Sequence, residues 1–199
     1  MLAPVFRASD AIVLAIPAGG VPVGAEIARR LALPLDLAVV SKILLPWTTE
    51  SGFGAVAFDG TEWINEVDLR RLALAKEDVE RSAAAAREKV ARRVARLRGD
   101  RPMPALADRP VILVDDGIAA GSTLRTAIAA LRKLGARRIV AAVPTGHDRS
   151  ADLIAGLADE VYCANLRGGG RFAVADAYEQ WADVSDEEAL SILRPLPAP

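Results

Sequence analysis

The segment VILVDDGIAAGSTLRTAI, from Val111 to Ile128, holds the residues of this chain best suited to chemistry. An apolar run ends in two acids, Asp115 and Asp116, and a turn of small residues then leads into Ser122 and Thr123. Neighbouring carboxylates can accept hydrogen bonds from vicinal hydroxyls, as on a ribose, or help to hold Mg²⁺. We therefore interpret the two acids as ligands of a diol or of a divalent cation.

The turn that follows the acids has the features of a phosphate-binding loop. Its glycines let an anion approach the backbone where a Cβ would obstruct it. A helix that starts after such a turn directs N–H groups and the positive end of its dipole at the anion. In the alternative interpretation the acids cap the turn and a hydroxyl caps the helix. That interpretation does not explain why acids, glycines and hydroxyls all occur in one short segment. The predicted contacts are Gly117, Ile118, Ala119, Ala120, Gly121, Ser122 and Thr123.

Five short apolar runs are expected to form the strands that position this turn. Near-continuous apolarity is typical of parallel strands covered by helices on both faces, and segments with helical spacing lie between the runs. This alternation predicts an α/β fold with a doubly wound, mostly parallel sheet of about five strands. Ligands of such sheets bind at the carboxyl ends of the strands, where the acids lie. The runs are Ala11–Ile16, Leu35–Val40, Pro110–Asp115, Arg138–Pro144 and Glu160–Leu166.

Residues 41–65 break this alternation. Two glycines and the Asp59-Gly60 turn between apolar stretches predict a mobile loop that leads into a hairpin beside the site. After it, apolar residues at helical spacing from Val79 to Leu97 mark a long helix with a basic face. We interpret that face as solvated rather than as a nucleic-acid site, because it lacks interleaved aromatic residues.

Composition narrows the classes of function. The 199 residues are 52% hydrophobic and 26% charged, which favours one folded domain over 1–199, with a core at about 11–166 and a C-terminal cover over 167–195. A net charge of −1 argues against a nucleic-acid partner. One cysteine and one histidine exclude an internal disulfide and a Cys/His zinc cluster, which favours a cytoplasmic location. The longest uncharged run is too short for a bilayer, so no membrane partner is expected.

Together these motifs resemble the type I phosphoribosyltransferases, and more closely a poorly characterised prokaryotic branch of that family. The strand, the two acids and the small-residue loop ending in Gly-x-Thr match its signature. PAGGVPVGAEIARRL resembles its pyrophosphate loop, SKILLPWTTESGFGAVAFDG its mobile loop and hairpin, and RFAVADAYEQWADVSDEEAL its C-terminus. The resemblance extends from Ala11 to Leu193.

The resemblance implies a reaction of 5-phosphoribosyl-1-pyrophosphate (PRPP) with Mg²⁺. Pyrophosphate leaves C1 of the ribose, and a nitrogen nucleophile, usually of a nucleobase, attacks that carbon. Asp115 and Asp116 would then hold the ribose hydroxyls and, directly or through water or those hydroxyls, the metal ion. The turn Ile118 to Thr123 would wrap the 5′-phosphate. The partners implied are PRPP and a small-molecule acceptor, and a homodimer is an assembly that the resemblance allows.

At the pyrophosphate end, the resemblance assigns backbone contacts to Ala18, Gly19 and Gly20, through a strained or cis peptide. Lys42, at the end of the second predicted strand, would be the remaining cation near that group.

Three positions depart from the related branch, which usually has Arg at Ala18, Arg at Ser41 and Thr at Ala120. A charge-assisted bond to phosphate contributes about 1.5–3 kcal/mol, so loss of two guanidinium groups would weaken pyrophosphate binding unless another cation reaches the site. The departures keep a second hypothesis open, a degenerate or regulatory protein that binds a phosphoribosyl group or nucleotide without transferase activity. Other sources of charge are Arg125, Arg167, Arg171 or a partner subunit.

Several other residues keep two interpretations. His147 could serve as a general base or lie in an exposed loop. Glu50 could orient substrate or be a solvated loop acid. Phe172, Tyr178 and Trp181 could form an aromatic lid or pack a C-terminal helix.

Overall fold

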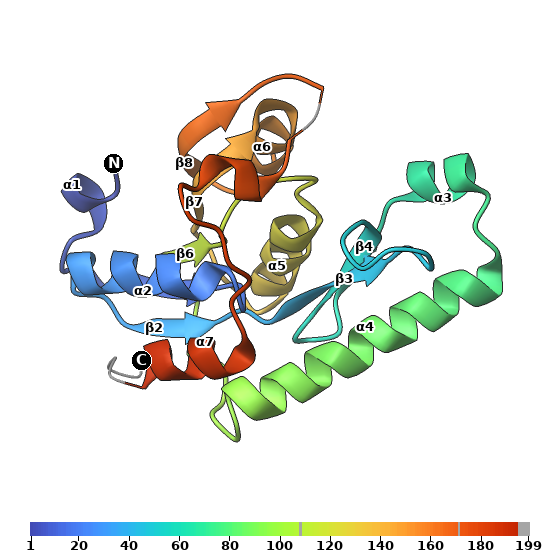
Figure 1. Cartoon of the computed structure of the whole chain (residues 1–199). Helices are drawn as coiled ribbons and strands as arrows, with labels where there is room; N and C mark the ends of the chain where they lie inside the picture. Colours follow the sequence, from blue (N-terminus) through green and yellow to red (C-terminus); the bar gives the residue numbers. More distant parts are fainter. Residues whose placement is uncertain (108, 171, 195–199) are drawn as a thin grey trace.

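The computed structural model describes residues 1–107, 109–170 and 172–194. Its main sheet has five parallel strands in the order β2-β1-β6-β7-β8, with helices on both faces (Figure 1). The prediction of a doubly wound α/β fold is therefore confirmed. The strands are β1 (Ile12–Ala15), β2 (Leu35–Leu37), β6 (Val111–Val114), β7 (Ile139–His147) and β8 (Glu160–Arg167).

The sheet is the boundary between two hydrophobic cores. Alternate residues of a strand point to opposite faces, so Val13 of β1 belongs to one core and Leu14 to the other. The first core is completed by helices α2, α4 and α7, and the second by α5 and α6. Burial on both faces explains why the central strands are continuously apolar. These helices are α2 (Gly20–Leu31), α4 (Lys76–Leu97), α5 (Ser122–Lys133), α6 (Asp148–Ala155) and α7 (Asp186–Leu193).

The predicted strand over Leu35–Val40 is wrong as a single element. The chain leaves the main sheet after β2 and enters a second, antiparallel sheet of order β3-β4-β5. Lys42 therefore lies in the middle of β3, opposite Ala55 of β4, and not at the end of a main-sheet strand. The predicted Asp59-Gly60 hairpin turn lies between β4 and β5. These strands are β3 (Val40–Leu44), β4 (Gly52–Ala57) and β5 (Glu62–Ile64).

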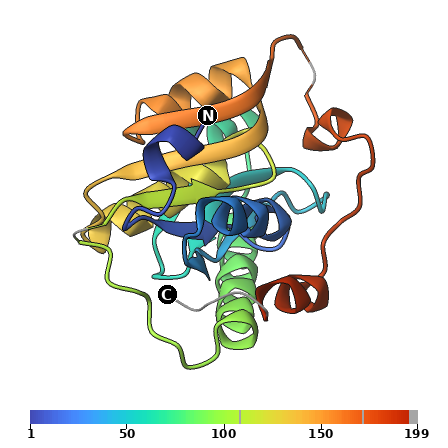
Figure 2. The ribbon, with the colours of Figure 1, turned by 90° about the vertical axis from the view of Figure 1, so that its left-hand side faces the viewer.

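Helix α4 is the long helix predicted from the apolar spacing. It packs along β3 and β4, while its first turns and α3 extend away from the main sheet (Figure 1). At its other end α7 packs against both α2 and α4, and the three helices lie together in Figure 2. The remaining short helices are α1 (Ala3–Phe6), α3 (Glu66–Leu72) and the 3₁₀ helix η1 (Val174–Ala177). Among the described residues, no helix combines the length and apolarity needed to cross a membrane.

Candidate functional site

The two acids lie directly after β6, at the carboxyl edge of the main sheet. Asp115 is buried, with 8% of its surface exposed. Its Oδ2 accepts a hydrogen bond from Oγ1 of Thr123 at 3.2 Å, and its Oδ1 accepts one from the N–H of Asp116 at 3.0 Å. Burial, and then the neighbouring charge of Asp116, raises the pKa of Asp115 well above its usual value. Burial also raises the pKa of Asp116, while the Lys42 ammonium opposes that rise.

The turn after the acids is fastened to β7 by the backbone of Ile118. Its N–H donates to the Thr145 carbonyl at 3.0 Å, and its carbonyl accepts from the N–H of His147 at 2.9 Å. Gly121 has φ of +79°, a left-handed conformation that favours glycine, and is the N-cap residue of α5. Ser122 therefore begins the helix rather than capping it. Among the described residues no side chain caps α5, so its first N–H groups face the turn.

The loop after β1 lies against the acids. A Cβ on Gly19 would collide with Oδ2 of Asp116, and one on Gly20 would come within 2.8 Å of the Val114 carbonyl. Both positions therefore require glycine for close approach rather than for a special φ. The peptide bond between Pro17 and Ala18 is cis, one of the two forms that the resemblance implies. The structure thus brings the predicted pyrophosphate loop, the acids and the predicted phosphate turn to one edge of the sheet.

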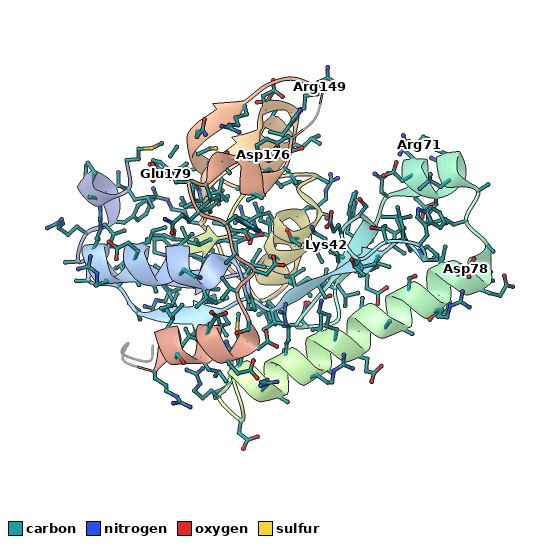
Figure 3. All side chains as sticks on the ribbon, in the orientation of Figure 1. Lys42, Arg71, Asp78, Arg149, Asp176 and Glu179 are labelled. Carbon is teal, nitrogen blue, oxygen red and sulfur yellow. The ribbon has the colours of Figure 1, made fainter. Side chains whose placement is uncertain are left out.

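Lys42 reaches this edge from the second sheet. It is exposed and projects from β3 in the middle of the molecule (Figure 3). Its charge favours the ionised form of Asp116, which indicates that the two side chains are near each other.

Helix α4 brings one cation of its basic face, Arg93, against the loop after β1, with Lys89 one turn earlier on the helix. Arg93 donates from Nη1 to the Pro17 carbonyl at 3.2 Å and forms an ion pair with Asp186 at 2.9 Å. Burial lowers the pKa of Lys89, and the charges of Arg93 and Lys42 lower it further. The interpretation of the whole basic face as solvated is therefore wrong at Arg93, which contacts the loop, whereas Lys89 is exposed.

The other proposed sources of positive charge have different partners. The Arg125 guanidinium stacks over the Trp63 ring at 4.8 Å. Arg167 donates to the Asp176 carbonyl at 3.0 Å. Arg171 lies outside the described residues.

The C-terminal segment covers the acids from one side. The Tyr178 hydroxyl donates to the Asp116 carbonyl at 2.7 Å, and its ring meets Trp181 edge to face at 5.0 Å. Burial, with the two nearby carboxylates, raises the pKa of Tyr178 to about 12. The aromatic residues precede α7 in the chain and lie outside it, and both the lid and the packing role remain predictions. Beside them is an open cavity of about 510 Å³ lined by Pro144, Thr145, Asn165, Ala177, Tyr178, Glu179 and Gln180.

Two further residues have defined places. His147 is the last residue of β7, half-buried rather than exposed, and its Nε2 lies 3.1 Å from the Gly169 carbonyl. Phe172 meets the His147 ring edge to face at 6.0 Å. Glu50 is exposed in the loop between β3 and β4. The structure tests neither the catalytic role considered for His147 nor that for Glu50.

Comparison with known proteins identifies the class. The family model described as the phosphoribosyl transferase domain matches residues 63–168, more than half of the chain, and the chain belongs to this family. Two Mycobacterium tuberculosis proteins, from strains H37Rv and CDC 1551, are each 38% identical over 185 residues and are named "Putative phosphoribosyl transferase". The alignment covers 92% of this chain and 41% of each relative, so the chain spans about two fifths of their length.

A solved structure is similar over nearly the whole chain. The crystal structure of TT1426 from Thermus thermophilus has a TM-score of 0.75 and 34% sequence identity. The match covers 98% of this chain and 91% of that one. The similarity therefore extends over nearly the whole chain and is not limited to the main sheet.

Proposed function

We propose that this protein is a phosphoribosyltransferase that transfers the phosphoribosyl group of PRPP, with Mg²⁺, to a small nucleobase-like nitrogen acceptor. The observation that carries the proposal is the contact of Gly19 with Asp116. This contact supports a common site for the loop and the two acids, and the bond from Thr123 of α5 to Asp115 supports the inclusion of the helix N-terminus. Those three features match the pyrophosphate, ribose and 5′-phosphate of PRPP in order.

In this mechanism the side chains position the substrate and stabilise charge. Loss of pyrophosphate leaves positive charge at C1. The negative carboxylates of Asp115 and Asp116 stabilise that charge. Asp115 is oriented for this by its bonds to Thr123 and to the Asp116 N–H. Lys42 offsets charge on the departing pyrophosphate. The Tyr178 bond to the Asp116 carbonyl fixes the backbone that carries the second acid.

The acids also fit a magnesium ion. No cluster of three metal-binding side chains occurs in the described residues, and Mg²⁺ commonly takes one or two carboxylates, with substrate oxygens and water as its other ligands. Asp115 and Asp116 would hold the ion in this way, and it would neutralise phosphate charge.

The acceptor site that we propose is the cavity of about 510 Å³ beside Tyr178. Its lining includes hydrogen-bonding side chains, those of Thr145, Asn165 and Gln180. Its volume is within the range of small-molecule sites. The proposal includes a cytoplasmic enzyme whose partners are small molecules, with neither nucleic acid nor membrane among them.

A second candidate is a binding protein without transferase activity. Ala18 and Ser41 favour it, because both are buried and neither can offer a positive charge to pyrophosphate. The two candidates differ in how strongly they discriminate PRPP from ribose 5-phosphate, which lacks the pyrophosphate group.

Calorimetry with Mg²⁺ tests the proposal. A transferase should bind PRPP at least tenfold more tightly than ribose 5-phosphate, since one contact of about 1.5–3 kcal/mol gives a decade or more. Lys42→Ala should reduce that preference, Asp116→Asn should weaken both ligands, and Lys76→Ala, at the far end of α4, should change neither. Isotope exchange between pyrophosphate and PRPP, screened over nucleobases, then identifies the acceptor. Equal affinities that Lys42→Ala leaves unchanged would favour the binding protein.

A further inference from the structure

Three cations from two elements are grouped together, and one of them, Arg93, contacts the loop 17–20. Lys42 comes from β3, and Lys89 and Arg93 come from α4, which packs on β3. Lys89 and Arg93 are four residues apart, so they occupy one face of the helix. Arg93 contacts the Pro17 carbonyl at 3.2 Å, one residue before Ala18. Arg93 therefore brings a positive charge to a loop that has no basic residue of its own.

These cations are close to one another and have few anionic partners. The charges of Arg93, Arg92 and Lys42 all disfavour the protonated form of Lys89, and only Asp186 favours it. Neither Lys89 nor Lys42 forms an ion pair within the described part of the chain. Grouping like charges in this way is unfavourable unless an anion joins them.

Asp186 of α7 pairs with Arg93 through one short and one long contact. Its Oδ1 lies 2.9 Å from Nη2 of Arg93, yet this buried oxygen has no hydrogen bond among the described residues. Its Oδ2 accepts from Nε of Arg93 at 3.3 Å, a long bond for a charged pair. A phosphate group could compete with Asp186 for this guanidinium, because it carries more charge and more acceptor oxygens than one carboxylate.

We propose that Lys89 and Arg93 of α4 bind the pyrophosphate group of PRPP, in place of guanidinium groups that Ala18 and Ser41 do not provide, and that Asp186 occupies Arg93 until PRPP displaces it. This inference rests on the proposed function. It assigns pyrophosphate recognition to the helix that covers the second sheet. It also makes α7 responsive to the ligand, because Asp186 loses its partner when PRPP binds.

The simplest alternative is that Arg93 only ties α7 to α4. Under that alternative, removal of the Asp186 charge loosens α7 and does not improve ligand binding. Under the proposal, Asp186→Asn removes a competing anion and tightens PRPP binding. The direction of this one change separates the two roles.

The experiment is calorimetry of the full chain with Mg²⁺, with PRPP and ribose 5-phosphate as separate ligands. Lys89→Ala should weaken PRPP binding tenfold or more and change ribose 5-phosphate binding less than twofold. The matched control is Arg92→Ala, which removes one charge from the same helix at an exposed pair with Glu88. It should change both affinities less than twofold. Asp186→Asn should tighten PRPP binding threefold or more.

Each other result overturns a defined statement. If wild type prefers PRPP but Lys89→Ala behaves like Arg92→Ala, the role of α4 is wrong and the proposed function stands. If wild type binds both ligands equally, the proposed function fails and this inference fails with it. If Asp186→Asn weakens PRPP binding, Arg93 is a structural tie and not a pyrophosphate ligand.

Discussion

Asp115 shows how a site residue can work against the stability of its own fold. It is buried next to a second carboxylate, and its pKa in the folded protein is above the unfolded value of about 3.9. Between those two values the folded chain binds more protons than the unfolded chain. The free energy of unfolding therefore falls as pH rises through that window.

Replacing this acid should stabilise the protein without ligand. Asp115→Asn removes the buried charge, so we expect a higher melting temperature than wild type above the raised pKa and a smaller difference near pH 4. For a chain of this length each kcal/mol corresponds to about 2–4 °C. Thermal unfolding across pH 4–8 measures this difference in melting temperature. As a control, Asp100→Asn, at an exposed position, should have the melting temperature of wild type throughout. A variant less stable than wild type throughout the range would contradict the argument.

Some site residues could be predicted from sequence because their signal is local. Asp115, Asp116 and the turn to Thr123 are consecutive, so a strand that ends there brings them together. The contact of Arg93 with Pro17 has no such signal, because it depends on which face of α4 packs toward the loop. The contact of Gly19 with Asp116 joins residues far apart in sequence, and it was expected only from the family resemblance, not from a local pattern.

At the scale of elements, the strands themselves could be predicted from the sequence more accurately than the partner strands to which they are hydrogen-bonded. Ala38 and Val39 are as buried as β2 before them, so the apolar run continues through the bend into β3. Only the hydrogen-bond partners change there. The glycines at 52 and 54 were expected to loosen a loop, yet both lie in β4, where a Cβ would collide with the carbonyls of Ile43 and Trp63. The loop is thereby confined to residues 45–51.

This short loop is the element that we expect to move when ligand binds. Trp47 lies in it with 63% of its surface exposed, and closure would exclude water from the reacting carbon. In a variant that keeps only this indole, Trp63→Phe with Trp181→Phe, fluorescence should shift on addition of PRPP and Mg²⁺. Trp47→Phe should show a much smaller response. An unchanged spectrum in the first variant would argue against closure.

On the scale of the whole molecule, a buried ion pair ties the end of α4 to the main sheet. Arg98, just after the helix, and Asp36 of β2 are 4% and 2% exposed in their side chains and lie 2.7 Å apart. Arg98 also donates to the carbonyls of Leu37 at 3.1 Å and Pro102 at 2.7 Å. The pair thus joins the edge of the main sheet to the helix that carries Lys89 and Arg93.

Removing one partner of this pair should lower the free energy of unfolding far more than replacing both partners by apolar residues. Arg98→Met leaves Asp36 buried without its main partner, so we expect a loss of about 3–5 kcal/mol in the free energy of unfolding. Adding Asp36→Leu removes the stranded charge and should recover most of that loss, because a buried pair is often no more stabilising than apolar residues of similar volume. Arg101→Ala, whose guanidinium is 4.0 Å from Asp36 and half-exposed, should cost less than about 1 kcal/mol. Urea unfolding of the four proteins measures these differences, and a double variant no more stable than Arg98→Met would show that the carbonyl bonds of Arg98, rather than its charge, hold the helix to the sheet.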